Sequence, residues 1–343
     1  MRVYCIGETD PYWNLAMEEA ALQGCTEGDY LLLWRNVPSV IVGRYQNTVE
    51  EVDQNYVRDR GLPVVRRITG GGCVYHDLGN LNYSYITDAG DAEELSIARF
   101  TRPVVEALRA LGVPAELTGR NDVLADGKKI SGCAQVIEGK RILHHGTLLF
   151  SASLEDAARA LRVRPEKYRS KSTKSVRARI GNISEFLSAG KNWSVLEFRD
   201  YLADCLGSGG ELFFPGAELL AEAGRLAKEK YRSWEWNYGE SPPFQYHDKK
   251  GFSCGLIELS LSVEEGRIAA VMFRGDFLAR RRLSELEGRL RGCALRREAL
   301  AGRLESVPLE EYFGSISAEE LAAFLTGVET PEIRGGDLDA GNG

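Results

Sequence analysis

The sequence of 343 residues contains no long apolar segment. Its apolar runs are much shorter than the ~18 to 20 residues that a membrane-spanning helix needs. The first five residues, Met1 to Cys5, include an arginine and lack the apolar core of a secretory signal. We therefore expect a cytoplasmic protein that does not act at a membrane.

An excess of positive charge and a pattern of paired cysteines are also missing. The 43 Lys and Arg residues are outnumbered by 50 Asp and Glu, and the resulting net charge of −7 argues against nucleic-acid binding. Seven cysteines are scattered without Cys-x-x-Cys spacing, so we predict neither a disulfide framework nor a zinc cluster. The four histidines form no His-Glu-x-x-His motif, and we predict no metal site built by the protein.

Two common nucleotide-binding signatures are absent as well. The chain has no Gly-x-x-x-x-Gly-Lys-Ser/Thr and no Gly-x-Gly-x-x-Gly after a first strand, which argues against P-loop and Rossmann sites. Glycine is instead concentrated in the segment 66–80, Arg-Arg-Ile-Thr-Gly-Gly-Gly-Cys-Val-Tyr-His-Asp-Leu-Gly-Asn. Consecutive glycines let backbone N–H groups approach a ligand, and Arg67 offers a planar fork for a carboxylate or phosphate.

This glycine-rich segment lies between two apolar runs, 62–65 and 81–86, so we expect a strand, a glycine loop and a second strand. A hairpin turn that binds nothing is the alternative. The flanking pairs Arg66-Arg67 and His76-Asp77 favour an anion-binding active-site loop.

A second group of polar residues follows further along the chain, at 119–122, 126–132 and 144–147. Turn signals near 125–127 and 137–140 predict a meander of at least three strands between Asp122 and Phe150. On such a meander Asp122, Lys129 and Thr147 would face one cleft, where the lysine can neutralise charge on a carboxylate or phosphate. From spacing alone, Lys128 and Lys129 could equally be solvated hairpin residues, and Asp122 could hold a metal ion or orient the lysine.

The overall pattern predicts an α+β protein of two domains. Helical spacing at 14–22 and 96–111 alternates irregularly with strand-like runs at 30–34 and 40–42, which favours α+β over a doubly wound sheet. A proline-bearing break at 239–243 separates a catalytic domain, 1–243, from a small hairpin-and-helix domain, 250–330, and a flexible tail, 331–343. The basic segment 162–179, with eight cations and one acid, is either a ligand-binding loop or a solvated linker.

These segments, in their order and spacing over nearly the whole chain, resemble lipoate-protein ligase. The resemblance is carried by 66–80, by Gly-Arg-Asn-Asp-Val at 119–123, by Asp-Gly-Lys-Lys-Ile-Ser-Gly-Cys-Ala at 126–134 and by His-His-Gly-Thr-Leu-Leu at 144–149. It extends to 174–182 and to Trp-Asn-Tyr-Gly at 236–239. Arg274 to Phe277 and Tyr312 to Gly314 resemble the accessory C-terminal domain of the longer ligases.

The resemblance implies a catalytic domain like that of biotin and lipoate ligases, with a mixed sheet and helices as in class II aminoacyl-tRNA synthetases, and a small α+β C-terminal domain. It implies that ATP, with Mg²⁺, converts lipoate to lipoyl-adenylate, and that the acyl group then moves to a lysine of a lipoyl-carrier domain. The carriers would be E2 subunits of 2-oxoacid dehydrogenases and the glycine cleavage H protein. We expect a monomer.

The resemblance also implies roles for individual residues. Lys129 would be the catalytic residue and would contact both nucleotide and lipoyl groups. ATP would bind Arg67, Gly72, Cys73, Val74, Tyr75 and Lys129, and lipoate would bind Lys129, Gly71, Gly72 and His145. Asn80, Asp122 and Thr147 are further candidates.

The chain departs from the usual family pattern at Thr69, where serine is usual, and at Cys73 and Cys133, where small residues are usual. Thr69 keeps the hydroxyl. The two cysteines leave an alternative open, a cysteine-dependent octanoyl or lipoyl transferase of the same fold that needs no ATP. Space-filling small side chains are the reading we prefer for both cysteines.

Overall fold

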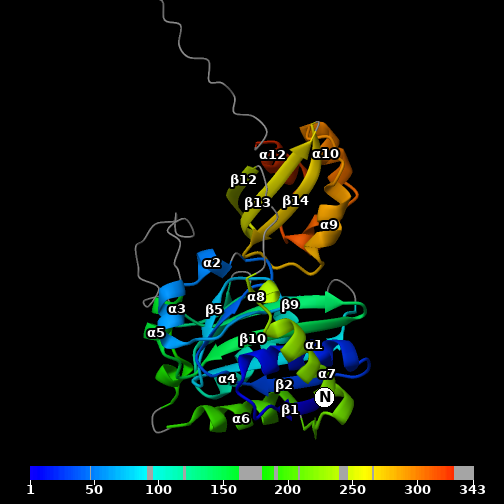
Figure 1. Cartoon of the computed structure of the whole chain (residues 1–343). Helices are drawn as coiled ribbons and strands as arrows, with labels where there is room; N and C mark the ends of the chain where they lie inside the picture. Colours follow the sequence, from blue (N-terminus) through cyan, green and yellow to red (C-terminus); the bar gives the residue numbers. More distant parts are fainter. Residues whose placement is uncertain are drawn as a thin grey trace, which may run out of the picture. The chain divides into compact units, whose positions relative to one another are not determined.

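The computed structural model describes residues 1–327 except 47, 91–95, 119–120, 162–179, 189–191, 208, 239–245 and 265. The chain divides into two compact units, Met1–Glu240 with Gly275–Arg281, and Ser241–Arg274 with Arg282–Gly343 (Figure 1). The predicted basic segment 162–179, the break at 239–243 and the tail at 331–343 lie outside the described residues. In the part of the chain that is described, no helix is long and apolar enough to cross a membrane.

The first unit contains an eight-stranded mixed sheet with the order β11-β1-β2-β6-β10-β9-β8-β7. The strands are β1 (Arg2–Cys5), β2 (Tyr30–Trp34), β6 (Asn80–Asp88), β7 (Ala115–Thr118), β8 (Asp122–Ala125), β9 (Lys128–Glu138), β10 (Arg141–Leu149) and β11 (Glu211–Leu212). β1 pairs in parallel with β2 and β11, and the remaining pairs are antiparallel. The predicted meander is confirmed as β8, β9 and β10. Its first turn has positive φ at both Asp126 and Gly127, as a tight hairpin requires.

Helices cover both faces of this sheet, which explains why β2 is apolar and buried at every position. α1 (Pro11–Gly24) and α7 (Ala217–Leu226) pack on the face that carries Leu32 and Trp34. α4 (Ile97–Ala110) and α6 (Val195–Gly207) pack on the opposite face, against Leu31 and Leu33 (Figure 1). α1 begins at a proline whose preceding residue, Asp10, accepts a hydrogen bond from the Tyr12 N–H.

A second, three-stranded sheet positions the glycine loop. It has the order β4-β3-β5, with β3 (Ser39–Val42), β4 (Val64–Arg66) and β5 (Val74–His76). The prediction that the loop simply joins two strands was therefore incomplete. Its end forms β5, which pairs with β3, whereas the run 81–86 belongs to β6 in the large sheet. A strand of three residues is too short to give a periodic pattern, so the sequence did not reveal it.

Short helices complete the first unit: α2 (Thr48–Glu51), α3 (Gln54–Arg60), α5 (Leu154–Ala160), α8 (Trp234–Asn237), a 3₁₀ turn at Ile183–Phe186 and a π-helical turn at Ala227–Tyr231. The segment Gly275–Arg281 also belongs to this unit. The Gly275 N–H donates to the Tyr45 carbonyl over 2.8 Å, and the Tyr45 and Phe277 rings stack at 5.6 Å. We call Gly275–Arg281 the strap.

The second unit is a small α+β domain. Its sheet has the order β12-β13-β14, formed by β12 (Tyr246–Phe252), β13 (Gly255–Glu264) and β14 (Arg267–Gly275). The helices are α9 (Leu283–Leu290), α10 (Arg297–Leu304), α11 (Leu309–Tyr312) and α12 (Ala318–Gly327). The predicted α+β class is confirmed for both units.

Candidate active site

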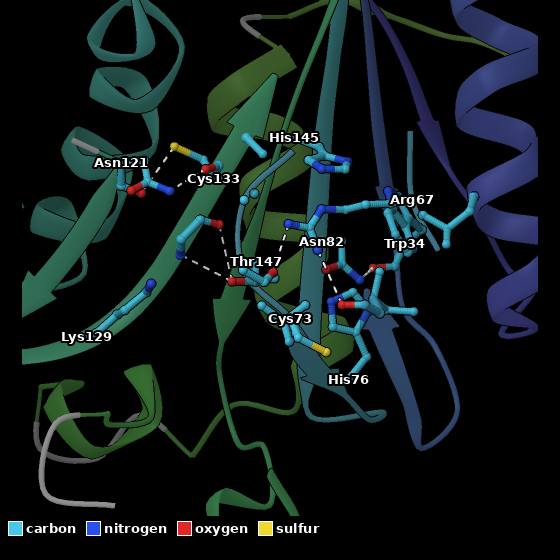
Figure 2. A pocket seen from close by; sticks show the side chains of 18 residues that line it. Trp34, Arg67, Cys73, His76, Asn82, Asn121, Lys129, Cys133, His145 and Thr147 are labelled. Atoms are coloured by element: carbon cyan, nitrogen blue, oxygen red, sulfur yellow. Dashed lines mark hydrogen bonds between the residues drawn. The ribbon is translucent and has the colours of Figure 1, made fainter. Parts of the chain in front are cut away.

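A cavity of ≈ 130 Å³ lies in the first unit. Residues of both sheets and of the glycine loop line it. Eight of the predicted site residues line it: Arg67, Gly71, Gly72, Cys73, Val74, Lys129, His145 and Thr147. Figure 2 shows Lys129 and Arg67 on opposite sides of this pocket. Two segments that are far apart in the sequence, the glycine loop and the β8-β9-β10 meander, therefore meet at one site as predicted.

The apolar wall of the cavity was only partly predicted. Leu15, Trp34, Ile41 and Val74 line it. Of the predicted run 40–42, Ile41 alone reaches the cavity, because neighbouring side chains of a strand point to opposite faces. Trp34 ends the predicted strand 30–34, and nothing in its spacing distinguished it from a core residue.

Arg67 is buried, and its guanidinium is used by the protein itself. It donates to the carbonyls of Gly70 at 2.6 Å and Gly72 at 2.9 Å, to Thr69 Oγ1 at 3.0 Å and to the Ile41 carbonyl at 3.3 Å. Four of its five N–H groups are thus occupied within the protein. Burial lowers the pKa of Arg67 to about 10, so the side chain stays charged at neutral pH.

These hydrogen bonds set the shape of the glycine loop. Because a trans peptide holds C=O and the following N–H antiparallel, capture of the Gly70 and Gly72 carbonyls turns the N–H groups of Gly71 and Cys73 away from the arginine. Gly71 has φ 90°, a conformation that favours glycine, and a Cβ there would lie 3.0 Å from Arg67 Nη2. A Cβ on Gly72 would meet no atom within 4 Å. The first of these two glycines is required by the fold, and the second faces open space.

The neighbouring Arg66 plays a structural part outside the pocket. Its guanidinium donates to the carbonyls of Gly43, Gln46 and Trp236, and its backbone N–H donates to Asn237 Oδ1 at 2.8 Å. The motif at 236–239 is thereby explained in part, since Trp236 and Asn237 anchor α8 to β4. Of the predicted arginine pair, Arg67 alone lines the cavity.

Lys129 presents its charge to the open side of the cavity. Its Nζ lies 2.7 Å from Asp122 Oδ1, and both side chains are more than one third exposed. Gly132 leaves room for the lysine, because a Cβ there would lie 3.0 Å from Lys129 Nζ. Thr147 in turn accepts the Gly132 N–H at 3.2 Å, which fixes this stretch of β9. The meander therefore holds an accessible ammonium group next to a single carboxylate.

Cys133 has the properties of a buried structural thiol. Its Sγ donates to the Asn121 carbonyl at 3.3 Å, and burial raises the pKa of Cys133 to about 12. Such a thiol is protonated at neutral pH and is a poor nucleophile. Cys73 is half-buried at the cavity wall and forms no disulfide. The geometry of Cys133 thus argues against a transferase that uses this cysteine as its nucleophile.

Three predicted residues, Tyr75, Asn80 and Asp122, do not line the cavity. Tyr75 lies on β5 and is buried in a core cluster with Val40 and Val42, and Asn80 donates to Asn82 Oδ1 at 3.0 Å. Asn82 itself lines the cavity, as does His76, and sequence reasoning assigned neither of them a ligand role. Asp122 reaches the site through its ion pair with Lys129.

Comparisons with known proteins agree with this geometry. The family model of the lipoyl protein ligase A/B catalytic domain matches residues 10–207, and that of the bacterial lipoate protein ligase C-terminus matches residues 241–325. The chain belongs to the lipoate-protein ligase family. The expected family is thereby confirmed, and with it the expectation that this protein is an enzyme.

Two relatives cover nearly the whole ligase. Lipoate-protein ligase LplJ of Bacillus subtilis is 43% identical over 91% of this chain and 95% of its own length. Lipoate–protein ligase 1 of Staphylococcus aureus is 41% identical over 93% of this chain and 97% of its own. Both relatives therefore include a region equivalent to each of the two units.

Solved structures share the fold. P. falciparum LipL1 in complex with lipoate has a TM-score of 0.75 at 22% identity and covers 95% of this ligase and 99% of its own chain. A bipartite lipoate protein ligase from Thermoplasma acidophilum, studied with its E2 lipoyl domain, has a TM-score of 0.63 at 31% identity, with coverage of 71% and 98%. Lipoate-protein ligase A bound with ATP has a TM-score of 0.60 at 28% identity, with coverage of 69% and 98%.

Proposed function

We propose that this protein uses ATP to activate free lipoate as lipoyl-adenylate and then transfers the lipoyl group to a lysine of a lipoyl-carrier domain. The observation that carries the proposal is the Lys129 ammonium, exposed at the cavity and 2.7 Å from Asp122, opposite a glycine loop shaped by Arg67. Activation brings together two anions, the carboxylate of lipoate and the α-phosphate of ATP. A fixed cation between them lowers their repulsion as the new bond forms.

The two parts of the cavity suit the two parts of the adenylate. Leu15, Trp34, Ile41 and Val74 provide an apolar wall for the lipoyl tail. The rim with Lys129, Thr147 and the glycine loop is polar and suits the carboxylate and the phosphate. An ATP-bound ligase among the structural relatives supports the choice of nucleotide.

The residue roles follow from this division. Lys129 contacts nucleotide and lipoyl groups, the backbone of Gly72 to Tyr75 lies along the nucleotide, and Gly71 and Gly72 border the lipoyl group. Arg67, which lines the cavity, contacts the nucleotide as well, and Asp122 aligns the lysine. His145 and Thr147 flank the lipoyl group, while Asn80 acts through Asn82.

Several finer features belong to the same proposal. Mg²⁺ would be held mainly by ATP phosphates, since the described residues include no group of three His, Cys, Asp or Glu side chains placed to bind a metal. The carriers would be E2 subunits of 2-oxoacid dehydrogenases and glycine cleavage H protein, and an archaeal ligase studied with an E2 lipoyl domain supports the first. We further propose a cytoplasmic monomer whose catalytic domain spans 1–243 and whose accessory domain spans 250–330.

The test is to incubate the purified protein with lipoate, Mg²⁺ and an apo lipoyl domain, with and without ATP, and to measure the carrier mass. We expect the mass of one lipoyl group to be added only with ATP. A Cys73→Ala/Cys133→Ala variant is the matched control and should retain this activity. Transfer from lipoyl or octanoyl donors without ATP, lost in that variant, would replace the ligase by the transferase alternative.

A further inference from the structure

Glu18 is a buried carboxylate beside the site that no sequence motif indicated. It lies on α1, is 1% exposed and does not line the cavity. Its oxygens accept hydrogen bonds from Ser84 Oγ at 2.5 Å and from His145 Nδ1 at 2.9 Å. A buried carboxylate is unfavourable unless it is fully hydrogen-bonded or paired with a cation, so its position requires an explanation.

Two chains of hydrogen bonds end on this carboxylate. In the first, Trp34 Nε1 donates to Ser84 Oγ at 2.8 Å, and Ser84 donates to Glu18. In the second, Arg67 Nε donates to Thr69 Oγ1 at 3.0 Å, and Thr69 Oγ1 lies 2.8 Å from His145 Nε2. The outer ends of both chains, Trp34 and Arg67, line the cavity, as does His145.

The two ends of the second chain of hydrogen bonds have fixed roles. Arg67 can only donate and the Glu18 carboxylate can only accept. His145 Nδ1 therefore carries a proton that faces Glu18. With His145 neutral, its Nε2 accepts the Thr69 hydroxyl proton. Each hydrogen bond then polarises the next one in the same direction. The negative charge of Glu18 thereby stabilises the positive charge of buried Arg67 through His145 and Thr69.

We infer that Glu18 is a positioning residue, which holds Arg67 and Trp34 in place through Thr69, His145 and Ser84 and so sets the geometry of both walls of the site. This inference rests on the proposed function, since the walls are those assigned to nucleotide and lipoyl tail. It also explains why threonine can replace serine at position 69, because the hydrogen-bond chain needs only a hydroxyl group there.

The neighbouring Glu19 offers a matched control on the same helix. It is also buried, but its carboxylate pairs with Lys230 at 2.7 Å and accepts from the Tyr231 hydroxyl at 2.7 Å, away from the cavity. Glu18→Gln and Glu19→Gln remove the same charge from adjacent positions. A general effect of removing a buried carboxylate from α1 appears in both variants, whereas an effect on positioning appears in the first alone.

The experiment has two parts. In the wild-type protein without substrates, ¹⁵N-detected imidazole NMR should show His145 with its proton on Nδ1. In the adenylation reaction, measured as pyrophosphate release, we expect Glu18→Gln and Thr69→Val each to lower the rate by about 10- to 100-fold, because small displacements of positioning groups have effects of that size. Thr69→Ser and Glu19→Gln should stay within about threefold of wild type.

A double-mutant cycle separates a shared chain from independent damage. If Glu18 acts through Thr69, the double variant Glu18→Gln/Thr69→Val loses little more than either single variant. Additive losses, or a wild-type His145 protonated on Nε2 alone, would overturn the inference. If Glu18→Gln does not fold, the inference is tested by the other measurements. These are the adenylation rates of Thr69→Val and Thr69→Ser and the wild-type imidazole spectrum. Failure of the wild type to release pyrophosphate would refute the proposed function instead, and the spectrum would still test the hydrogen-bond chain.

Discussion

The two cations of the cavity differ in what they contact. Arg67 is 6% exposed and donates to three backbone carbonyls and a threonine hydroxyl. Lys129 has a side chain that is 39% exposed and contacts one carboxylate at 2.7 Å. The arginine fork matches several fixed acceptors at once, whereas the lysine is a compact charge on a flexible stem.

The difference indicates a division of labour. A cation whose donors are occupied by the loop organises the backbone, and its loss should lower stability together with the activity that depends on the loop. A cation exposed beside one carboxylate can exchange that partner for a substrate anion, and its loss should appear mainly as lost catalysis. Each of the following substitutions tests this distinction.

The largest effect on stability is expected for Arg67→Met. Methionine fills most of the volume, but it removes four hydrogen bonds and leaves the Glu18 carboxylate without its counter-charge. Breaking such a buried arrangement costs about 4 kcal/mol in unfolding free energy, measurable by urea denaturation. Arg58→Met, on an exposed side chain, is the control and should be neutral. An unchanged urea midpoint for Arg67→Met would refute the organising role.

Lys129→Ala should have the opposite profile. We expect loss of about 3 kcal/mol of transition-state stabilisation, about 100-fold in pyrophosphate release, with the thermal midpoint nearly unchanged. Lys128→Ala is the control, because that lysine instead pairs with Glu185 at 2.9 Å. If both variants release pyrophosphate at the wild-type rate, Lys129 is not the catalytic cation.

The unfolding free energy should also depend on pH, because His76 and His144 are buried in the first unit. Burial lowers the pKa of both His76 and His144 to about 3, so these histidines stay neutral in the fold while the unfolded chain takes up protons below about pH 6.5. Stability therefore falls as pH drops from about 6.5 toward 3, by about 1.4 kcal/mol per pH unit for each histidine. His144→Gln should reduce that slope by one histidine's share, measured by urea unfolding across this range.

The smallest effect concerns adjacent glycines of the loop. Gly71→Ala places a Cβ 3.0 Å from Arg67 Nη2 at a φ of 90°, and should lower stability by about 1 to 2 kcal/mol. Gly72→Ala meets no atom within 4 Å and should keep wild-type stability, with its effect confined to ligand binding. Thermal unfolding measures the effect of each substitution on stability, and isothermal titration calorimetry with ATP measures its effect on binding. Equal destabilisation by both would mean that Arg67 does not shape this loop.

Local patterns predicted the elements that are long or marked by turns. The continuous apolar run at 30–34 became β2, and the turn residues at 126–127 correctly indicated the β8-β9 hairpin that brings Lys129 to Asp122. Periodicity works here because each pattern reflects burial of one or both faces. The family resemblance, carried by motif spacing, supplied the identity of the substrates.

Features that depend on distant segments could not be predicted. β5 has three residues and is stabilised by pairing with β3, more than thirty residues earlier in the chain. Glu18 and His145 are separated by 127 positions, and in a helix containing two adjacent glutamates nothing indicates which one turns toward the site. Arg67 lines the cavity, but its carbonyl partners depend on a loop conformation that composition does not specify.

The strap gives the chain a nested order, because the polypeptide returns from the second unit to the first for Gly275–Arg281 and then leaves again. Its Phe277 carbonyl accepts the Gly71 N–H at 3.0 Å, and its backbone lies where a Cβ on Gly70 would clash. A fragment that ends near residue 240 would therefore lack part of its own glycine loop's support, although it contains every residue of that loop. One cut in the chain therefore cannot separate the two units, because the strap lies within the sequence of the second unit but belongs to the first. This applies to gene fusion, domain exchange and limited proteolysis alike.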